Sequence, residues 1–591
     1  MSEIYRWLSN SGVLNKITKP SRYIAKELNA IKKETSEKLR FLLLFPDTYE
    51  IGMSHLGLKI LYRYLNEEDF IFAERSYLPW KDMLAEMKKA EIPLYSYETY
   101  SPARDFHIIG ITLQYELSYT NVLAALEAAD IPIWQSERTS EPLIIGGGPC
   151  TANPEPVADF FDLLLIGDGE YASVEISRIV WNNLELLQQE KRKQLLIKLS
   201  DIQGVYVPSL GKKSVKKAVI DNLEDYPINR KPLVPFMVTV HDRANIELMR
   251  GCNRGCRFCQ AGMFYRPVRE RNHNEIVESI EDIIKNTGYD ELSLLSLSTM
   301  DYSAIEELSE KLLPFQNEKK IGLSLPSSRV DAFSVDMATK ISSIRKTGLT
   351  FAPEAGTQRL RNVINKNIDE RDIFAAIKNA VSNGWKRLKL YFMIGLPTET
   401  TEDLEGIVKL CSDIKNLGLR DITVSVATFI PKPQTPFQYA AQITPDEAWK
   451  RYDQLKRIRR FGKLQFSDPY RSYIDGALSR GGREIANVIY NAYRKGSFFD
   501  EWSEEFSYDT WLEAFKVNRL DILNYSKERK TDEIFPWSQI SIGIDEEFLK
   551  SEYFRSLKGL TTEDCRNGTC SSCGVCYSLN VTNRLDKTWK H

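Results

Sequence analysis

The sequence predicts an α/β protein in which a Rossmann-like, doubly wound N-terminal domain precedes a partial (β/α)6 TIM-like barrel and a mostly helical C-terminal region. Three observations support this prediction: apolar runs of strand length alternate with helical stretches over residues 36–210, the alternation resumes over 244–440, and it stops after Pro431-Lys432-Pro433. Continuous apolar runs are typical of parallel strands covered on both faces, and helical crossovers connect such strands. A chain of 591 residues is long enough for several domains.

The N-terminal series begins after a helical, charged lead-in expected over residues 1–35. Four strands are expected in the domain at 36–210: Leu39–Phe45, Phe106–Gln114, Pro142–Pro149 and Phe161–Glu170. HLGLKILYRYL and TNVLAALEAADI have helical spacing between them. Ligands of doubly wound sheets bind at the carboxyl ends of strands, where this chain has Gly146–Gly148 and Gly167-Asp168-Gly169-Glu170. The two carboxylates of that second segment are interpreted as turn residues.

The second series follows a polar, proline-marked segment at 211–243 that is expected to be a linker. Its six expected strands are Ala244–Leu248, Glu291–Ser296, Ile321–Pro326, Leu349–Pro353, Leu388–Ile394 and Thr423–Ile430. Six strands rather than eight indicate a barrel open enough to admit a large substrate. Residues 441–591 lose the alternation, and a helical region with a cysteine-rich, metal-binding tail is expected there.

Composition excludes some classes of function. The 79 basic and 81 acidic residues give a net charge of −2, which argues against a dedicated polyanion binder. No apolar run approaches the roughly 18 residues that a membrane span needs, so no membrane partner is expected. The N-terminus lacks the continuous apolar region of a secretion signal, and a cytoplasmic location is therefore expected.

Seven of the nine cysteines fall into two tight groups. The first is Cys252-x3-Cys256-x2-Cys259, directly after a predicted strand. Three thiolates at this spacing can hold one face of an iron–sulfur cubane and leave the fourth iron open, whereas a structural zinc site normally has four protein ligands. His273 is the first histidine that follows the group in the sequence. Structural or zinc-binding cysteines are the alternative interpretation.

The C-x3-C-x2-C spacing, with the aromatic Phe258 before the last cysteine, resembles the signature of radical S-adenosylmethionine (SAM) enzymes. This resemblance implies a [4Fe-4S] cluster on Cys252, Cys256 and Cys259. SAM would bind its open iron and be cleaved reductively to a 5′-deoxyadenosyl radical, with an electron from a flavodoxin or ferredoxin. It also implies cofactor contacts near strand ends, at Phe258, Ser296, Ser298, Ser328, Arg329, Glu354 and Ile394. One departure is LLSLSTMD, where the family often has a Gly-Gly-Glu stretch.

FPDTYEIGMSHLGLKIL, IIGGGP and LLIGDGE resemble the B12-binding subclass of this family, and the C-terminal segments resemble one group within it that has a four-cysteine tail. The usual cobalt-ligating signature, Asp-x-His-x-x-Gly, is altered here to Met53-Ser54-His55-Leu56-Gly57. Two alternatives remain open: cobalamin binds without that histidine ligand, or it does not bind. His55 is interpreted as a structural residue at a helix start.

The second cysteine group is Cys565-x4-Cys570-x2-Cys573-x2-Cys576. Four thiolates within twelve residues predict a metal site, and the CSSCGVC segment resembles a ferredoxin cluster loop. An auxiliary iron–sulfur cluster is favoured over zinc. Such a cluster could relay electrons, bind substrate or donate sulfur.

The leading functional hypothesis is therefore a radical SAM enzyme that performs methyl transfer or sulfur insertion on an unknown substrate. The alternative is a non-catalytic iron–sulfur or zinc scaffold that binds RNA or protein. The basic stretch Lys456–Arg460 could face an RNA phosphate backbone, although a solvated helix face is favoured.

Overall fold

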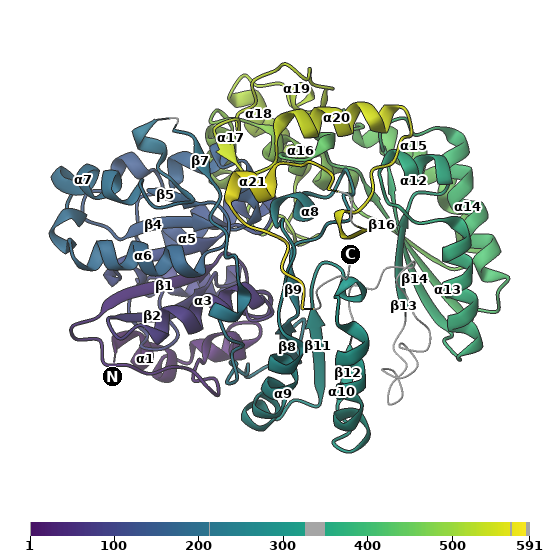
Figure 1. The fold of residues 1–591 in the computed structure, drawn as a ribbon. Helices are drawn as coiled ribbons and strands as arrows, with labels where there is room; N and C mark the ends of the chain where they lie inside the picture. The colour runs from purple at the N-terminus through teal and green to yellow at the C-terminus, as the bar shows by residue number, and fades with distance from the viewer. Residues whose placement is uncertain (1, 212, 325–348, 568–569, 587–591) are drawn as a thin grey trace.

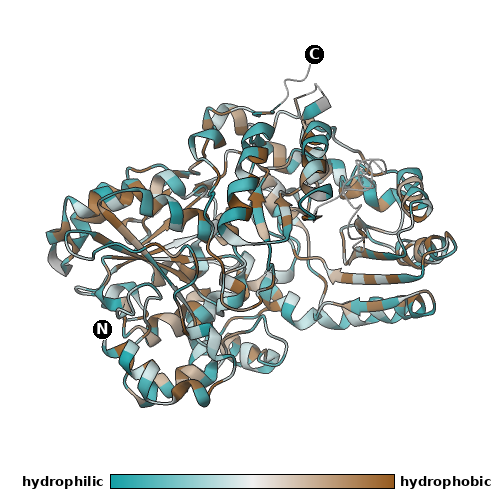
Figure 2. Ribbon diagram, turned by 90° about the horizontal axis from the view of Figure 1, so that it is seen from below, coloured by the Kyte–Doolittle hydropathy of each residue, from teal (hydrophilic) through white to brown (hydrophobic). Residues whose placement is uncertain are grey.

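The computed structural model describes residues 2–211, 213–324, 349–567 and 570–586. A parallel sheet with its helices forms the N-terminal part, and a second set of parallel strands forms the barrel (Figure 1). C-terminal helices lie between and above the two, and Figure 2 shows the apolar strands of the N-terminal sheet enclosed by helices. The α/β fold class predicted from the sequence is confirmed.

The N-terminal sheet has the strand order β2-β1-β3-β4-β5-β6. Its first five members are parallel and β6 is antiparallel. The order 2-1-3-4-5 is that of a doubly wound sheet, which binds ligands beside β1 and β3. The bounds are β1 Leu39–Phe45, β2 Ile71–Tyr77, β3 Ile108–Thr112, β4 Leu143–Gly147, β5 Leu163–Leu165 and β6 Val205–Tyr206.

The edge strand β2 was not predicted, because its sequence IFAERSY carries charges in the middle of the strand. All seven residues are nevertheless buried. Glu74 accepts from Arg40 at 2.5 Å, and Arg75 pairs with Glu98 at 2.7 Å and with Glu27 at 3.0 Å. Buried charges persist only when they are paired in this way.

The two faces of this sheet are covered by different parts of the chain. Leu42 and Leu44 of β1 pack in one cluster with helix α5 (Tyr119–Ala128) and the C-terminal helices. Leu43 and Phe45 face the opposite cluster. The helices concerned are, on the first face, α16 Pro469–Arg480, α17 Ile485–Arg494 and α18 Tyr508–Val517, and, on the second, α1 Glu3–Asn10, α3 Leu56–Glu67, α6 Glu170–Trp181 and α7 Gln189–Leu199. The C-terminal region thus completes the N-terminal core.

The barrel strands form two parallel groups, β12-β11-β8 and β13-β14-β15-β16. The first group comprises β8 Ala244–Glu247, β11 Glu291–Leu295 and β12 Gly322–Ser324, and the second β13 Leu349–Glu354, β14 Arg387–Ile394, β15 Asp421–Thr428 and β16 Lys463–Phe466. The helices beside them are α9 His273–Thr287, α10 Ile305–Asn317, α13 Glu370–Ser382, α14 Thr401–Lys415 and α15 Pro445–Leu455.

Strand β16 contradicts the expectation that the strand–helix alternation stops after residue 440. It pairs in parallel with β15 after the crossover helix α15. The strand is only four residues long, and its alternate residues Lys463 and Gln465 are exposed. A short half-exposed strand has no apolar run to mark it in the sequence.

The lead-in and the linker are both tied to neighbouring parts of the fold. Within the described residues of the lead-in, only Glu3–Asn10 is α-helical, although the whole segment was expected to be helical. In the linker, β7 (Val215–Lys216) pairs with β17 (Ile540–Ser541), and Ala218 bridges to Gly167. None of the helices in the described part of the chain has both the length and the apolar character to cross a membrane.

Candidate active site

The first cysteine group lies on a loop between the short strand β9 (Met249–Arg250) and the helix α8 (Gln260–Phe264). Gly251 opens the loop with a φ of +86°, and a Cβ there would lie 2.3 Å from the carbonyl oxygen of Pro267. Only glycine fits this position without moving the backbone. Cys259 is the N-cap of α8, and its sulfur accepts a hydrogen bond from the Gly262 amide at 3.3 Å.

The three thiols are all partly buried and lie close enough to influence one another. Burial, with smaller contributions from the neighbouring Cys256 and Cys252, raises the pKa of Cys259 to about 12. A cationic cluster reverses this preference, because bound metal stabilises thiolates. Within the described residues, no three His, Cys, Asp or Glu side chains are arranged to hold a single metal ion. Three thiolates from one loop are a donor set that suits a cubane, whose ligands sit at separate corners.

Distant segments hold this loop in place. Arg257 is fully buried and donates to Glu552 of α20 (Glu546–Leu557) at 2.9 Å and to the carbonyl of Val363 at 2.9 Å. Asn365 donates to the carbonyl of Gly255 at 3.1 Å. These contacts tie the loop to α20 and to the segment that follows β13.

A cavity of about 430 Å³ separates the carboxyl edge of the N-terminal sheet from the barrel. Its barrel side is formed by Met249–Gly251 and Leu295–Leu297, next to the cysteine loop. A Cβ built on Gly147 would meet nothing closer than 3.9 Å, so a side chain there would occupy the cavity. The other glycines in its wall are Gly57, Gly110, Gly148, Gly167, Gly169 and Gly251, and its apolar residues include Phe41, Leu43, Ile60, Leu61, Ile111, Ile145 and Leu165.

His55 lies in the wall of this cavity but is used as the N-cap of α3. Its Nδ1 accepts a hydrogen bond from the Leu58 amide at 3.1 Å, which places the proton of a neutral ring on Nε2. Burial lowers the pKa of His55 to about 4, against a smaller opposing effect of a hydrogen bond to Gln114. The sequence interpretation of His55 as a residue that starts a helix is confirmed.

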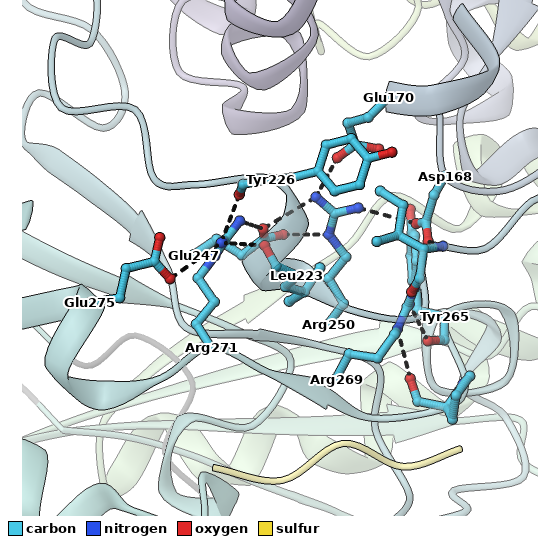
Figure 3. Close-up of polar contacts among 12 residues, drawn as sticks. Asp168, Glu170, Leu223, Tyr226, Glu247, Arg250, Tyr265, Arg269, Arg271 and Glu275 are labelled. Atoms are coloured by element: carbon cyan, nitrogen blue, oxygen red, sulfur yellow. Dashed lines mark hydrogen bonds and ion pairs between the residues drawn. The ribbon is translucent and has the colours of Figure 1, made fainter. Parts of the chain in front are cut away.

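Ion pairs between the N-terminal domain and β9 line one side of the cavity, which we call the charged wall (Figure 3). Arg250, two residues before Cys252, lies 2.5 Å from Glu170, 3.3 Å from Asp168 and 2.7 Å from Glu247. Burial raises the pKa of Asp168, but Arg269 at 2.5 Å and Arg250 hold it far below its usual value.

The network corrects the interpretation of Asp168 and Glu170 as turn residues. They are ion-pair partners that fix the N-terminal sheet to the strand leading into the cysteine loop. The network continues through Arg271, which lies 3.1 Å from Glu247 and 3.9 Å from Glu275. The density of arginines on both sides of the first cysteine group was the available sequence signal.

The four-cysteine tail lies against the cysteine loop. Asn583 accepts a hydrogen bond from Asn253 at 3.0 Å and donates one to the sulfur of Cys565 at 3.7 Å. Cys565 and Cys573 are partly buried, whereas Cys570 and Cys576 are exposed. The tail also runs past β9 (Figure 1) and its partner strand β10 (Arg269–Glu270). The Glu270 amide of β10 donates to the carbonyl of Arg584 at 2.9 Å.

Further polar contacts connect the same two segments. Asp301 accepts from Arg254 of the loop at 2.7 Å and lies 3.0 Å from Arg566 of the tail. His273, the first histidine after the loop in sequence, lies 2.5 Å from Asp586 through its Nδ1.

Comparison with known proteins identifies two matching family models, described as "Radical SAM proteins, N-terminal" over residues 57–208 and "Radical SAM superfamily" over 246–411. The uncharacterized protein MJ0966 of Methanocaldococcus jannaschii is 32% identical over 406 residues, which are 67% of this chain and 78% of that protein. The chain belongs to the radical SAM superfamily. It is therefore an enzyme of this superfamily.

Two further similarities are more remote. The tRNA-2-methylthio-N(6)-dimethylallyladenosine synthase of Clostridium botulinum is 23% identical over 276 residues, which are 44% of this chain and 56% of that enzyme. The similarity to the solved structure of OxsB, a cobalamin-dependent SAM radical enzyme with aqua-cobalamin and SAM bound, covers 92% of this chain and 83% of the OxsB chain. Its sequence identity is 12% and its TM-score is 0.47.

Two of the cofactor contacts predicted for a radical SAM enzyme, Glu354 at the end of β13 and Phe258 in the cysteine loop, lie near the same lysine. Glu354 has a φ of +65° and accepts a hydrogen bond from Lys366 at 3.1 Å. The Lys366 ammonium lies 6.0 Å from the centre of the Phe258 ring. This lysine, which the sequence reasoning missed, connects Glu354 to the cysteine loop.

The other predicted contacts are in different surroundings. Ser296 is in the cavity wall and hydrogen-bonds to Thr299 at 3.0 Å, whereas Ser298 is buried and donates to Asp301 at 2.6 Å. The Ile394 side chain is completely buried in the barrel core. Ser328 and Arg329 lie outside the described residues.

Proposed function

We propose that the protein holds a [4Fe-4S] cluster on Cys252, Cys256 and Cys259 and uses it to cleave SAM for C–H functionalisation of a substrate. The observation that carries this proposal is the single preformed loop that presents three thiols beside a cavity. Cys252, Cys256 and Cys259 would hold the cluster, which when bound would supply the one-electron reduction that cleaves SAM. A low-potential donor such as a flavodoxin or ferredoxin would provide that electron.

The side chains around the loop have separate tasks in this proposal. Lys366 and Glu354 form a charged pair that can orient the amino acid end of SAM next to Phe258. Ser296 lies beside the second strand end, where a hydroxyl can donate to the same ligand. Arg257 holds the loop, and its burial helps to exclude water from the site.

The cavity beside the loop suits a large, flat cofactor, and we extend the proposal to a corrinoid. The glycine edge at Gly147 leaves room for such a ring, and Phe41 and Leu43 offer an apolar surface. His55 caps a helix with one nitrogen, so we propose that His55 does not ligate the cobalt. Bound cobalamin would supply a methyl group for transfer.

The reaction class is methyl transfer or sulfur insertion, and RNA is a candidate substrate. A similar enzyme from Clostridium botulinum is named for methylthio modification of tRNA, which supports both parts of this proposal. For the tail cysteines, we propose an auxiliary iron–sulfur cluster rather than zinc. Sulfur insertion requires that cluster loss at Cys565–Cys576 abolish product while SAM cleavage continues.

The test is reductive SAM cleavage by the protein purified without oxygen and reconstituted with iron and sulfide. We expect about eight irons per chain and 5′-deoxyadenosine on reduction. The Cys252/Cys256/Cys259→Ala variant should retain about half of the iron and form no 5′-deoxyadenosine. About four irons per chain, together with normal SAM cleavage, would indicate that the tail cysteines hold zinc instead of a second cluster. No cleavage and no variant-sensitive iron would favour the non-catalytic scaffold.

A further inference from the structure

A second cavity, of about 530 Å³, lies where the C-terminal helices meet the N-terminal domain. Three arginines line it: Arg480 at the end of α16, Arg483 and Arg529. Glu155 and Gly211 contribute from the N-terminal half of the chain. The cavity shares no lining residue with the one beside the cysteine loop.

Arg480 is completely buried without a carboxylate partner within ion-pair distance among the described residues. Its terminal nitrogens donate only to carbonyl groups, at 2.8 Å to Tyr525, 3.0 Å to Lys527 and 3.3 Å to Gln438. Its Nε is buried and has no hydrogen-bond partner in this part of the structure. Burial, with a smaller contribution from the neighbouring Arg529, lowers the pKa of Arg480 to about 9. A buried cation without a counter-ion costs free energy, so an anion at this place would stabilise the fold.

Arg529 adds a second guanidinium that is only weakly neutralised. It donates to the carbonyl of Arg480 at 2.8 Å and lies over the ring of Phe535, 5.5 Å from its centre. Its acidic neighbour, Glu533, is 3.6 Å away, and the Glu533 side chain is 43% exposed. A half-exposed carboxylate at this distance can rotate into solvent at little cost.

Arg483 behaves differently from these two arginines. It lies 3.2 Å from Glu155 and 3.7 Å from Asp159, so its charge is balanced within the protein.

Glu484 also lines the cavity and accepts hydrogen bonds from the Tyr525 hydroxyl at 3.1 Å and the Gly482 amide at 2.9 Å, but it forms no ion pair with an arginine among the described residues. Arg480 and Arg529 are therefore the arginines of the cavity that have no buried carboxylate within ion-pair distance in this part of the structure.

We propose that this cavity binds a phosphate group through Arg529 and the positive field of Arg480, with Glu533 moving aside. Guanidinium groups match phosphate oxygens in geometry and charge. A free nucleotide and an RNA backbone carry the same group, so both are sources of this ligand. The site goes beyond the proposed SAM chemistry, since its lining includes no residue of the cysteine loop or of the first cavity.

The experiment is isothermal titration calorimetry of the full chain with inorganic pyrophosphate, AMP and a single-stranded oligoribonucleotide. We expect Arg529→Gln to weaken pyrophosphate binding about tenfold and Glu533→Gln to strengthen it about threefold, because a competing negative charge is removed. The matched control is Arg459→Gln, at an exposed position of the basic stretch, which should leave the affinity unchanged. Preference for AMP would identify a nucleotide site, and preference for the oligoribonucleotide an RNA site.

Failure of all three compounds to bind would overturn the proposal. So would affinities that do not respond to either Arg529→Gln or Glu533→Gln, because a purely structural arginine pair predicts that result. Arg480→Met is a supporting variant, and the other two decide the test if it does not fold. The titration needs no reductant and no SAM, so its result is independent of the proposed radical chemistry.

Discussion

The two cysteine groups differ in how much of their geometry the protein itself provides. The loop of Cys252, Cys256 and Cys259 is partly buried and is anchored by the fully buried Arg257. In the tail, Cys570 and Cys576 are exposed. A preformed loop can receive a cluster without rearranging, whereas an exposed thiol group depends on its metal for order. We infer that the loop holds the reactive centre and that the tail is an adjunct to it.

Removing one thiol from each group is expected to have the largest effect and tests the difference between the two groups. We expect Cys252→Ala to reduce SAM cleavage more than about 100-fold, because the cluster loses one of three ligands. Cys570→Ala should reduce it less than about threefold, because that thiol lies outside the loop. The measurement is the rate of 5′-deoxyadenosine formation with dithionite. Equal losses in the two variants would show that the groups form one functional centre.

The next largest effect is expected at Arg250, which links the loop to the N-terminal sheet. Arg250→Met leaves Glu170, Asp168 and Glu247 buried with less positive charge around them. We expect a loss of about 3 kcal/mol in the free energy of unfolding. Denaturant unfolding measures it, with Arg243→Met as control, because Arg243 pairs with the part-exposed Glu291. A loss no larger than that of the control would mean that the charged wall does not anchor the loop.

A smaller effect is expected on the pH dependence of the free energy of unfolding, and it tests the state of His55 in the wall of the first cavity. His55 has a pKa of about 4 in the fold and about 6.5 when unfolded. The unfolded chain therefore binds more protons between these values, and stability is lost as the pH falls from about 6.5 to about 4. His55→Asn keeps a helix-capping side chain but cannot titrate, so the slope should fall by at most about 1.4 kcal/mol per pH unit.

Unfolding free energies measured at several pH values between 4 and 7 provide this test. The same slope in His55→Asn and in the parent protein would show that His55 is not buried as a neutral cap. A corrinoid titration of the two proteins adds an independent readout, since equal affinities are expected when His55 is not a cobalt ligand.

Much of the fold was predictable because the information is local. Apolar runs such as Leu39–Phe45 mark strands buried on both faces, and the six expected barrel strands were found in this way. The cysteine loop was predictable for the same reason, since its ligand spacing lies within eight residues. Where strands were missed, the local pattern was absent: β2 carries buried ion pairs and β16 is short and half-exposed.

The site was only partly predictable, because its supports come from residues far apart in sequence. The pairs Arg250–Glu170 and Arg257–Glu552 span 80 and 295 positions, and no spacing rule connects such residues. Lys366 was missed because a single lysine in a loop has no distinctive pattern. Ile394 is in the core because strand residues alternate between the two faces.

The most direct test of the central claim is electron paramagnetic resonance of the reduced, reconstituted protein before and after SAM is added. A site-differentiated cluster on the loop predicts that SAM changes the signal, because SAM binds the open iron. The change should persist in the Cys565/Cys570/Cys573/Cys576→Ala variant and vanish in Cys252/Cys256/Cys259→Ala. A signal that SAM leaves unchanged, or a change that survives loss of the loop cysteines, would contradict the account.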